Sequence, residues 1–184
     1  MKHIKSLRSK LAAFTLIELL VVISIIAVLA SLALPAITGA LVKGQIAQTA
    51  SNYRQLYILT QTASLDAAQT GQTNIGFPGD VGGVPAWSNG LINGGYITNT
   101  AFASLLNVQG IANSSAVYNV SGSGNSQNVF ISTANITNTT AAGAFVPTVA
   151  PYRNKGGALV TVGGAAFSVV GTNLNTNNYV FGTN

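Results

Sequence analysis

One apolar run near the N-terminus constrains this chain more than any other feature. The 24 residues from Leu19 to Val42 contain no charged side chain and are mostly leucine, isoleucine, valine and alanine. As a helix rising 1.5 Å per residue they would be about 36 Å long, more than the roughly 30 Å of a bilayer's hydrocarbon core. The run predicts a membrane-spanning helix over residues 14–42. Pro35 should kink it, because proline has no N–H and clashes with the preceding turn.

A single acid, Glu18, stands at the entrance to this run. A carboxylate inside such a helix costs roughly 2.5–3.5 kcal/mol on insertion scales, so Glu18 needs a partner. A secretory signal peptide is a poor alternative, because its apolar region is only about 7–15 residues long. A single-pass anchor carrying an extracytoplasmic binding domain fits the length of the run, but it leaves Glu18 unexplained.

The basic charge of the chain is concentrated before the apolar run. Of eight lysines and arginines, four lie in residues 1–13, while the other four nearly balance the three acids. The net charge of +5 therefore describes a short leader and gives no sign of a nucleic-acid-binding surface. Such a leader stays on the cytoplasmic side of a membrane helix. The four leader cations are Lys2, Lys5, Arg8 and Lys10.

Helical periodicity continues beyond the apolar run, over residues 43–70. Ile46, Tyr53 and Tyr57 recur at helical spacing among polar residues, which indicates an amphipathic continuation with one face against a domain. We expect this helix to end near Gly71, because glycine is the residue that most often follows the end of a helix. We therefore expect one helix running from the membrane segment into a head.

The remaining residues, 71–184, are rich in Gly, Asn and Thr and predict a small β head. Residues 76–95 look like a turn-rich loop, and residues 99–108 like a short helix capped by Asn99 or Thr100. A surface loop is expected over 132–143. Short β-type runs lie at 116–122, 128–134, 158–164, 166–171 and 178–182, with a hairpin at Gly163–Gly164. The predicted fold is α+β, with a long N-terminal helix packed on a small antiparallel sheet.

Few side chains in this chain could perform catalysis. The only histidine is His3 in the leader, and there is no cysteine, so a histidine-dependent triad, a Cys–His dyad and a multi-ligand zinc site are ruled out. A two-carboxylate site would need Asp66 and Asp80 to converge across the Gly/Pro-rich segment, which we do not expect. Trp87 is predicted to be a buried anchor. The chain is not expected to be an enzyme or to bind a cofactor or metal.

The N-terminus resembles that of type IV pilins and type II secretion pseudopilins. The resemblance covers residues 8–37: a basic leader, the small residue Ala13, the sequence Phe14-Thr15-Leu16-Ile17-Glu18, and an apolar helix with Pro35. It implies that a prepilin peptidase cuts between Ala13 and Phe14 and N-methylates Phe14. Most members of the family have glycine before the cut, where this chain has alanine.

The resemblance also implies a role for Glu18 in filament assembly. The family's glutamate attracts the N-terminal amine of a neighbouring subunit, although Glu18 could instead reach the amine of its own chain, four residues earlier. The expected function is that of a structural subunit in a pilus-like filament. A type II secretion pseudopilin is favoured, because a chain without cysteine cannot form the disulfide loop of many type IV pilins. The alternative is a type IV pilus subunit for adhesion, motility or DNA uptake.

The partners and location follow from the same resemblance. The partners would be the prepilin peptidase, further copies of this chain, other pilins or pseudopilins, the inner-membrane assembly platform and the lipid bilayer. The subunit would first span the bacterial inner membrane once, with its leader in the cytoplasm and its head in the periplasm. It would then enter a periplasmic or surface filament.

Overall fold

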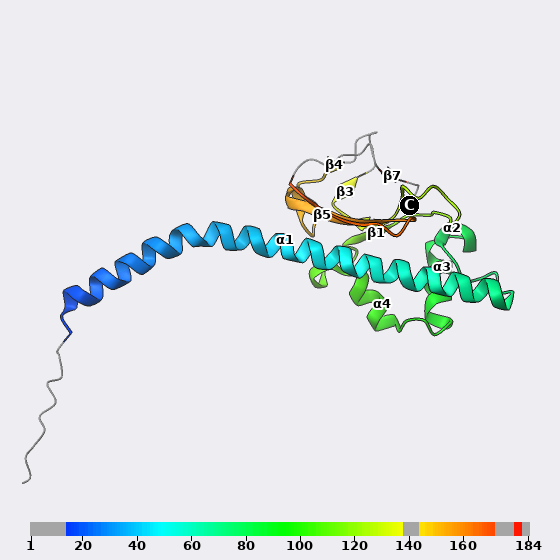
Figure 1. Ribbon diagram of the computed structural model, residues 1–184, viewed down its shortest axis with the longest axis horizontal. Helices are drawn as coiled ribbons and strands as arrows, with labels where there is room; N and C mark the ends of the chain where they lie inside the picture. Colours follow the sequence, from blue (N-terminus) through cyan, green and yellow to red (C-terminus); the bar gives the residue numbers. More distant parts are fainter. Residues whose placement is uncertain (1–13, 138–143, 172–178, 182–184) are drawn as a thin grey trace, which may run out of the picture. The chain divides into compact units, whose positions relative to one another are not determined.

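The computed structural model describes residues 14–137, 144–171 and 179–181 (Figure 1). The chain divides into two compact units, Met1–Ala40 and Leu41–Asn184, and each is described by itself. The predicted long N-terminal helix is confirmed as α1, Leu16–Thr70, which contributes to both units. The leader, including Ala13, lies outside the described residues.

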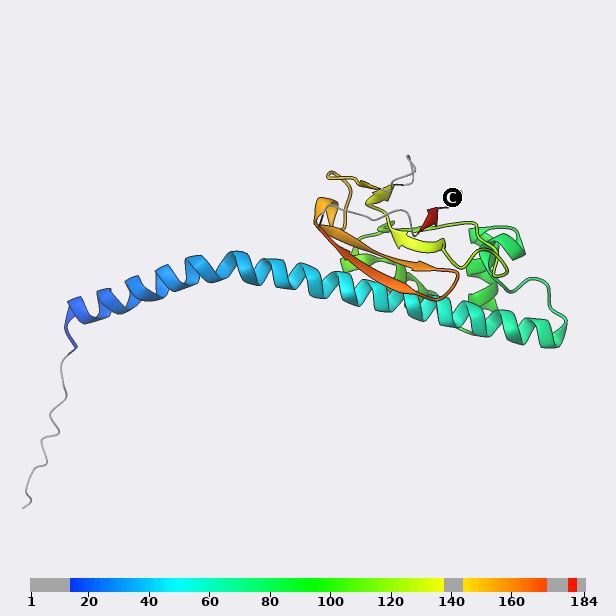
Figure 2. The same cartoon turned by 45° about the horizontal axis from the view of Figure 1, so that its top comes forward.

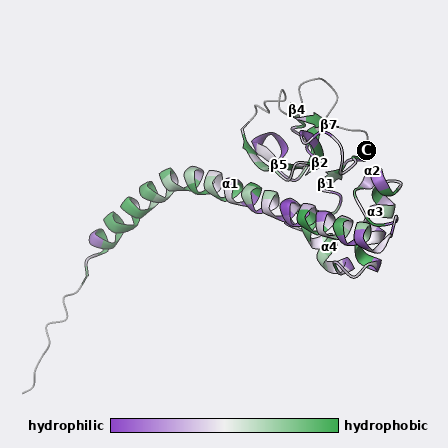
Figure 3. Cartoon of the chain, turned by 45° about the vertical axis from the view of Figure 1, so that its right-hand side comes forward, coloured by the Kyte–Doolittle hydropathy of each residue, from purple (hydrophilic) through white to green (hydrophobic). Residues whose placement is uncertain are grey.

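In the first unit, the apolar side chains of α1 are exposed. The ribbon of this part is coloured mostly green, for hydrophobic residues, in Figure 3. Among the described residues α1 is the one helix long and apolar enough to cross a membrane. Its hydroxyls are satisfied within the helix: Ser24, Ser31 and Thr38 donate to carbonyls three or four residues earlier, at 2.7, 2.8 and 3.0 Å. The helix continues through Pro35, and the kink there stays a prediction.

In the second unit, α1 buries one face against the head. The buried positions follow each other at helical intervals, as the amphipathic pattern predicted. Tyr57, expected on this face, is half-buried. The helix ends at Thr70, and Gly71 takes a left-handed φ of 71°, which confirms the predicted stop. The buried positions are Ile46, Thr49, Ala50, Tyr53, Leu56, Thr60, Ala63 and Ala67.

The main sheet of the head is antiparallel over four strands in the order β1-β2-β5-β6, and a short β7 adds to β2 in parallel. Each β-type run of the sequence contains residues of one strand, and β5 and β6 form the predicted hairpin. Gly164 in its turn has a φ of 78°, a conformation that favours glycine. The strands are β1 Ser115–Val117, β2 Asn128–Thr133, β5 Gly156–Thr161, β6 Ala166–Val170 and β7 Val180–Phe181.

Both faces of this sheet are covered at its central strands, β2 and β5. A Cβ placed on Gly156 would lie 2.8 Å from the Ile46 side chain of α1, whereas one on Gly157 would lie 3.0 Å from Ile136 and Phe145. Successive strand residues point to opposite faces, so α1 covers one face of the sheet. The other face is covered by a two-stranded ribbon of β3, Ile136–Thr137, and β4, Ala144–Phe145 (Figures 1 and 2).

The predicted surface loop over residues 132–143 is wrong at its start. Ser132 and Thr133 end the buried strand β2, and β3 follows at Ile136; residues 138–143 lie outside the described part. The polar side chains of β2 can be buried because they form hydrogen bonds. The Ser132 hydroxyl lies 3.2 Å from the Tyr118 hydroxyl, and Thr133 accepts from the Ala158 N–H at 3.3 Å.

The predicted loop over residues 76–95 is also wrong, because it contains α2, Pro78–Val81, and α3, Val84–Asn93. Pro78 is the first residue of α2 and Pro85 the second residue of α3. Neither N–H would have a partner within its helix, so these prolines lie at helix starts and do not interrupt the helices. The predicted short helix is confirmed as α4, Asn99–Leu106, but its cap is Thr98, which accepts from the Ala101 N–H at 3.3 Å. Two 3₁₀ turns complete the head, η1 Val108–Gly110 and η2 Arg153–Lys155.

Trp87 is buried, as predicted, but it lies in helix α3. Its indole N–H donates to the Thr60 hydroxyl of α1 at 3.0 Å. Its ring packs 5.2 Å from the ring of Phe102 and 5.4 Å from that of Phe130 in β2. Trp87 therefore fastens α3 to both α1 and the sheet.

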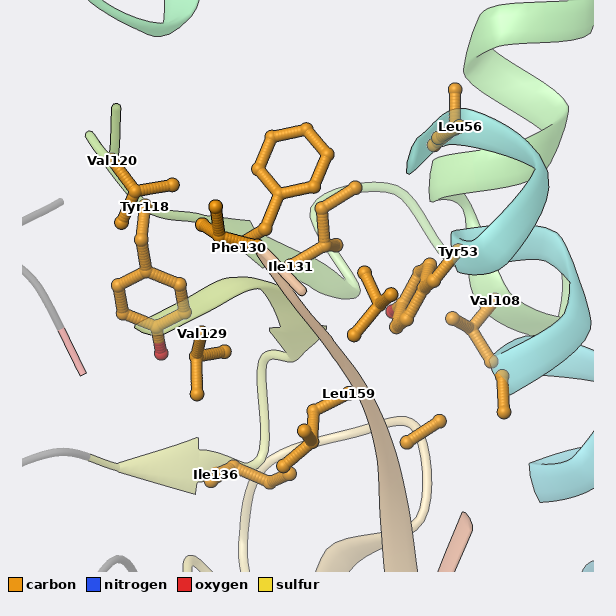
Figure 4. Close-up of a cluster of buried hydrophobic side chains, with 14 of the residues drawn as sticks. Tyr53, Leu56, Val108, Tyr118, Val120, Val129, Phe130, Ile131, Ile136 and Leu159 are labelled. Carbon is orange, nitrogen blue, oxygen red and sulfur yellow. The ribbon is translucent and has the colours of Figure 1, made fainter. Parts of the chain in front are cut away.

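The core between α1 and the sheet combines apolar packing with a few buried hydroxyls. Figure 4 shows Tyr53 and Leu56 of α1 beside Phe130 and Ile131 of β2. The Tyr53 hydroxyl lies 2.6 Å from that of Ser115 in β1. Because a hydrogen bond has a narrow range of geometry, such pairs fix the rotation of α1 as well as its burial.

Candidate functional site at the start of the long helix

The predicted cleavage junction lies just before α1. Phe14 and Thr15 precede Leu16, the first helical residue, and Phe14 is 76% exposed. Its predicted partner in the junction, Ala13, lies outside the described residues. The cleavage before Phe14 and its methylation therefore stay predictions. On the described side of the junction, the side chain of Phe14 is exposed.

Glu18 makes hydrogen bonds with Thr15, which occupies the N-cap position. The carboxylate Oε2 accepts from the Thr15 backbone N–H at 2.9 Å and from the Thr15 hydroxyl at 2.8 Å. In return, the Glu18 N–H donates to the Thr15 hydroxyl at 3.3 Å. This reciprocal arrangement is a capping box, which satisfies backbone donors that a helix start leaves without partners.

The capping box is visible in the sequence as Thr-x-x-Glu, a signal that reasoning from the charge alone missed. All three of its bonds use Oε2 or the Thr15 hydroxyl, and none uses Oε1. Cleavage before Phe14 would leave the Thr15 N–H intact as an amide. The box can therefore persist in the cleaved chain while Oε1 receives a cation. Whether that cation is the amine of its own chain or a neighbour's stays a prediction.

The two acids of the head lie in separate settings. Asp66 accepts from the Tyr96 hydroxyl at 3.3 Å. Asp80, in α2, accepts from the Ser121 hydroxyl and from the Gly122 N–H at 2.8 Å, which ties α2 to the turn before β2. Nowhere in the described ranges do three potential metal-binding His, Asp or Glu side chains gather.

The comparison with known families identifies the prokaryotic N-terminal methylation motif at residues 8–34. This segment contains the predicted junction, the capping box and the beginning of the apolar helix. The motif is typical of type IV pilins and pseudopilins, which are structural proteins anchored by an apolar N-terminal helix. The chain therefore carries a prepilin-type motif at its N-terminus, and such a motif is associated with processing by a prepilin peptidase and with assembly with pilins. No curated protein and no solved structure gave a significant match to the chain.

Proposed function

We propose that this protein is a structural, non-enzymatic filament subunit, and specifically a pseudopilin of a type II secretion system. The observation that carries the filament role is the methylation motif on an exposed apolar helix whose first turn holds Glu18. In the inner membrane, lipid would cover this helix. In the filament, the helices of neighbouring subunits would replace the lipid.

The role of Glu18 follows from the cost of burying charge. A new amine at Phe14 would carry a positive charge into the packed helices, where it needs a carboxylate within hydrogen-bonding distance. The capping box orients Glu18 through Oε2, which supports a role for Oε1 as the acceptor of that amine. We propose that the amine comes from a neighbouring subunit, so that charge pairing selects correctly placed subunits.

Two substitutions test this role. Glu18→Gln keeps a side chain that can complete a capping box but removes the charge, whereas Glu18→Leu removes both. Both variants should insert into the membrane and be cleaved, and neither should form filaments, as judged by electron microscopy and shearing. Normal filaments from Glu18→Gln would show that the charge is unnecessary and would refute the pairing. If only Glu18→Leu failed, the capping box would be the essential feature.

Processing gives an independent test of the motif. With a prepilin peptidase present, mass spectrometry should show the loss of residues 1–13 and a methyl group on Phe14. Ala13→Gly should speed cleavage, and Ala13→Leu should block it, because the peptidase must accept a small side chain there. An intact leader on membrane-inserted protein would contradict the proposal and favour the single-pass anchor.

The choice of a pseudopilus over a pilus rests on the absence of cysteine, which excludes the disulfide loop of many type IV pilins. Deleting the gene in the organism that encodes it should stop the export of folded proteins while surface pili and motility remain. The opposite result, normal export with lost adhesion, motility or DNA uptake, would assign the subunit to a type IV pilus.

A further inference from the structure

Three exposed cations lie on two segments of the head that pack together, and we call them the basic rim: Lys43, Arg153 and Lys155. Lys43 is the first charged residue after the 24 uncharged positions that end at Val42. A helix that spans the bilayer with those positions brings Lys43 to the headgroup level on the side of the head.

The other two cations come from the distant turn η2, which packs on the same stretch of α1. Tyr152, next to Arg153, places its hydroxyl 2.7 Å from that of Thr49. Gly156, next to Lys155, abuts the Ile46 side chain. Lys43 precedes Ile46 by three residues, so the two share a face of the helix. The orange turn at this end of the sheet can be followed in Figure 2.

The turn that carries Arg153 and Lys155 is held firmly. The side-chain amide of Asn135 is fully buried and donates to the carbonyls of Arg153 and Gly156, at 2.6 and 2.8 Å. The Lys155 carbonyl accepts from the Gly171 N–H at 3.0 Å. Arg153 has a φ of 56°, which costs energy for a residue other than glycine and is retained where the surroundings enforce it.

No acidic side chain is available nearby to neutralise the rim. The chain has three acidic side chains. Glu18 precedes the apolar run, Asp66 hydrogen-bonds to Tyr96, and Asp80 hydrogen-bonds to the turn before β2.

An exposed apolar side chain adjoins the rim, because Val170 pairs with Gly156 and is 48% exposed. Cations beside exposed apolar surface are typical of segments that lie on a membrane.

We infer that the basic rim docks the head on anionic phospholipid headgroups at the surface where α1 leaves the bilayer. The negative surface potential of such lipids attracts nearby lysines and arginines. The docked head would be held in one orientation before assembly and would be released when the subunit leaves the membrane. The inference requires membrane anchoring only, so it does not depend on the secretion system or on the Glu18 pairing.

The test uses the full chain, one copy per lipid nanodisc, with a fluorescent probe on Asn154→Cys. The chain has no cysteine, and Asn154 is exposed between the two rim cations, so the label is unique and local. Nitroxide-labelled headgroups should quench the probe in discs containing phosphatidylglycerol, and much less in discs of phosphatidylcholine alone. At 1 M salt, where the screening length is about 3 Å, the difference should vanish.

Variants separate the rim from other cations. Arg153→Gln with Lys155→Gln should lower the ratio of docked to undocked heads about 25-fold, at about fivefold per cation. Arg54→Gln, which removes an exposed cation of α1 outside the rim, is the matched control and should change the ratio less than about twofold. Circular dichroism should show that all variants stay folded.

Three results would overturn the inference. Equal quenching in neutral and anionic discs would exclude an electrostatic contact. Quenching that survives 1 M salt would assign the contact to apolar residues such as Val170. Quenching that needs two copies per disc and disappears with Asp66→Asn and Asp80→Asn would identify a neighbouring subunit as the partner.

Discussion

The hydrogen bond between Trp87 and Thr60 allows a quantitative test of how α3 is fixed on α1. The Thr60 hydroxyl accepts from the indole N–H at 3.0 Å and donates to the Leu56 carbonyl at 2.8 Å. Both side chains are buried, with exposures of 1% for Trp87 and 0% for Thr60. Thr60→Val keeps the shape of the side chain and removes the acceptor, so the indole N–H has no partner.

The expected cost of Thr60→Val is about 1–3 kcal/mol, the penalty of a buried donor without a partner. The Leu56 carbonyl loses little, because it still accepts the ordinary helical bond. In a Trp87→Phe background no indole remains, and the same substitution should be nearly neutral. The coupling energy between the two sites should therefore be about 1–3 kcal/mol.

Urea unfolding of the full chain in detergent, followed by near-ultraviolet circular dichroism, measures all four variants of this cycle. Circular dichroism is needed because Trp87, the only tryptophan, is absent from two of them. In thermal unfolding the single substitution should lower the midpoint by about 3 °C per kcal/mol for a domain of this size. An equal cost of Thr60→Val in both backgrounds would refute the assignment of the bond.

Three further predictions concern the helix start, the tyrosines and the glycines. Thr15→Val should cost the first turn of α1 about 1 kcal/mol and speed its amide exchange about fivefold, whereas Thr15→Ser should not. Burial raises the pKa of Tyr53, so the folded head retains a proton that the unfolded chain loses above pH about 10. Above that pH the free energy of unfolding should fall by up to about 1.4 kcal/mol per pH unit. In Tyr53→Phe the urea midpoint should decline less steeply with pH than in the parent chain. Gly156→Ala should lower the free energy of unfolding by about 1–3 kcal/mol, because its Cβ would meet the Val169 carbonyl, while Gly44→Ala, with nothing within 4 Å, should stabilise α1 by about 0.5–1 kcal/mol.

The sequence pattern was sufficient to predict those elements whose conformation depends mainly on their own residues. The long helix follows from an uninterrupted apolar run joined to an amphipathic stretch. Each of these two patterns can be recognised from residues that are neighbours in the sequence. The end at Gly71 and the turn at Gly164 follow from backbone conformations that favour glycine. The cap formed by Thr15 and Glu18 is also local, since the two residues are three positions apart. It could have been predicted, had the Thr-x-x-Glu pattern been considered.

The segments that sequence reasoning misassigned depend on partners far along the chain. Residues 76–95 carry turn-forming glycines and prolines, yet α3 forms there because Trp87 finds a pocket beside Phe102 and Phe130 and an acceptor on Thr60. Ser132 and Thr133 look like loop residues until Tyr118 and Ala158 supply their hydrogen bonds. Propensity is a weak local preference, and these tertiary contacts outweigh it.

The sequence by itself determined the long apolar helix, the prepilin-type motif, the small set of charges and the strand segments of the main sheet, because each is encoded in neighbouring residues. Only the tertiary structure decided which charges act together. Lys43 and Lys155 are separated by more than half of the chain, and the packing of Gly156 on Ile46 brings their segments to one end of the head. Asp80 lies far from Gly122 in sequence, but in the folded head its hydrogen bond joins α2 to the turn before β2. Such proximity results from side-chain packing between distant segments, so it cannot be predicted from a local sequence pattern.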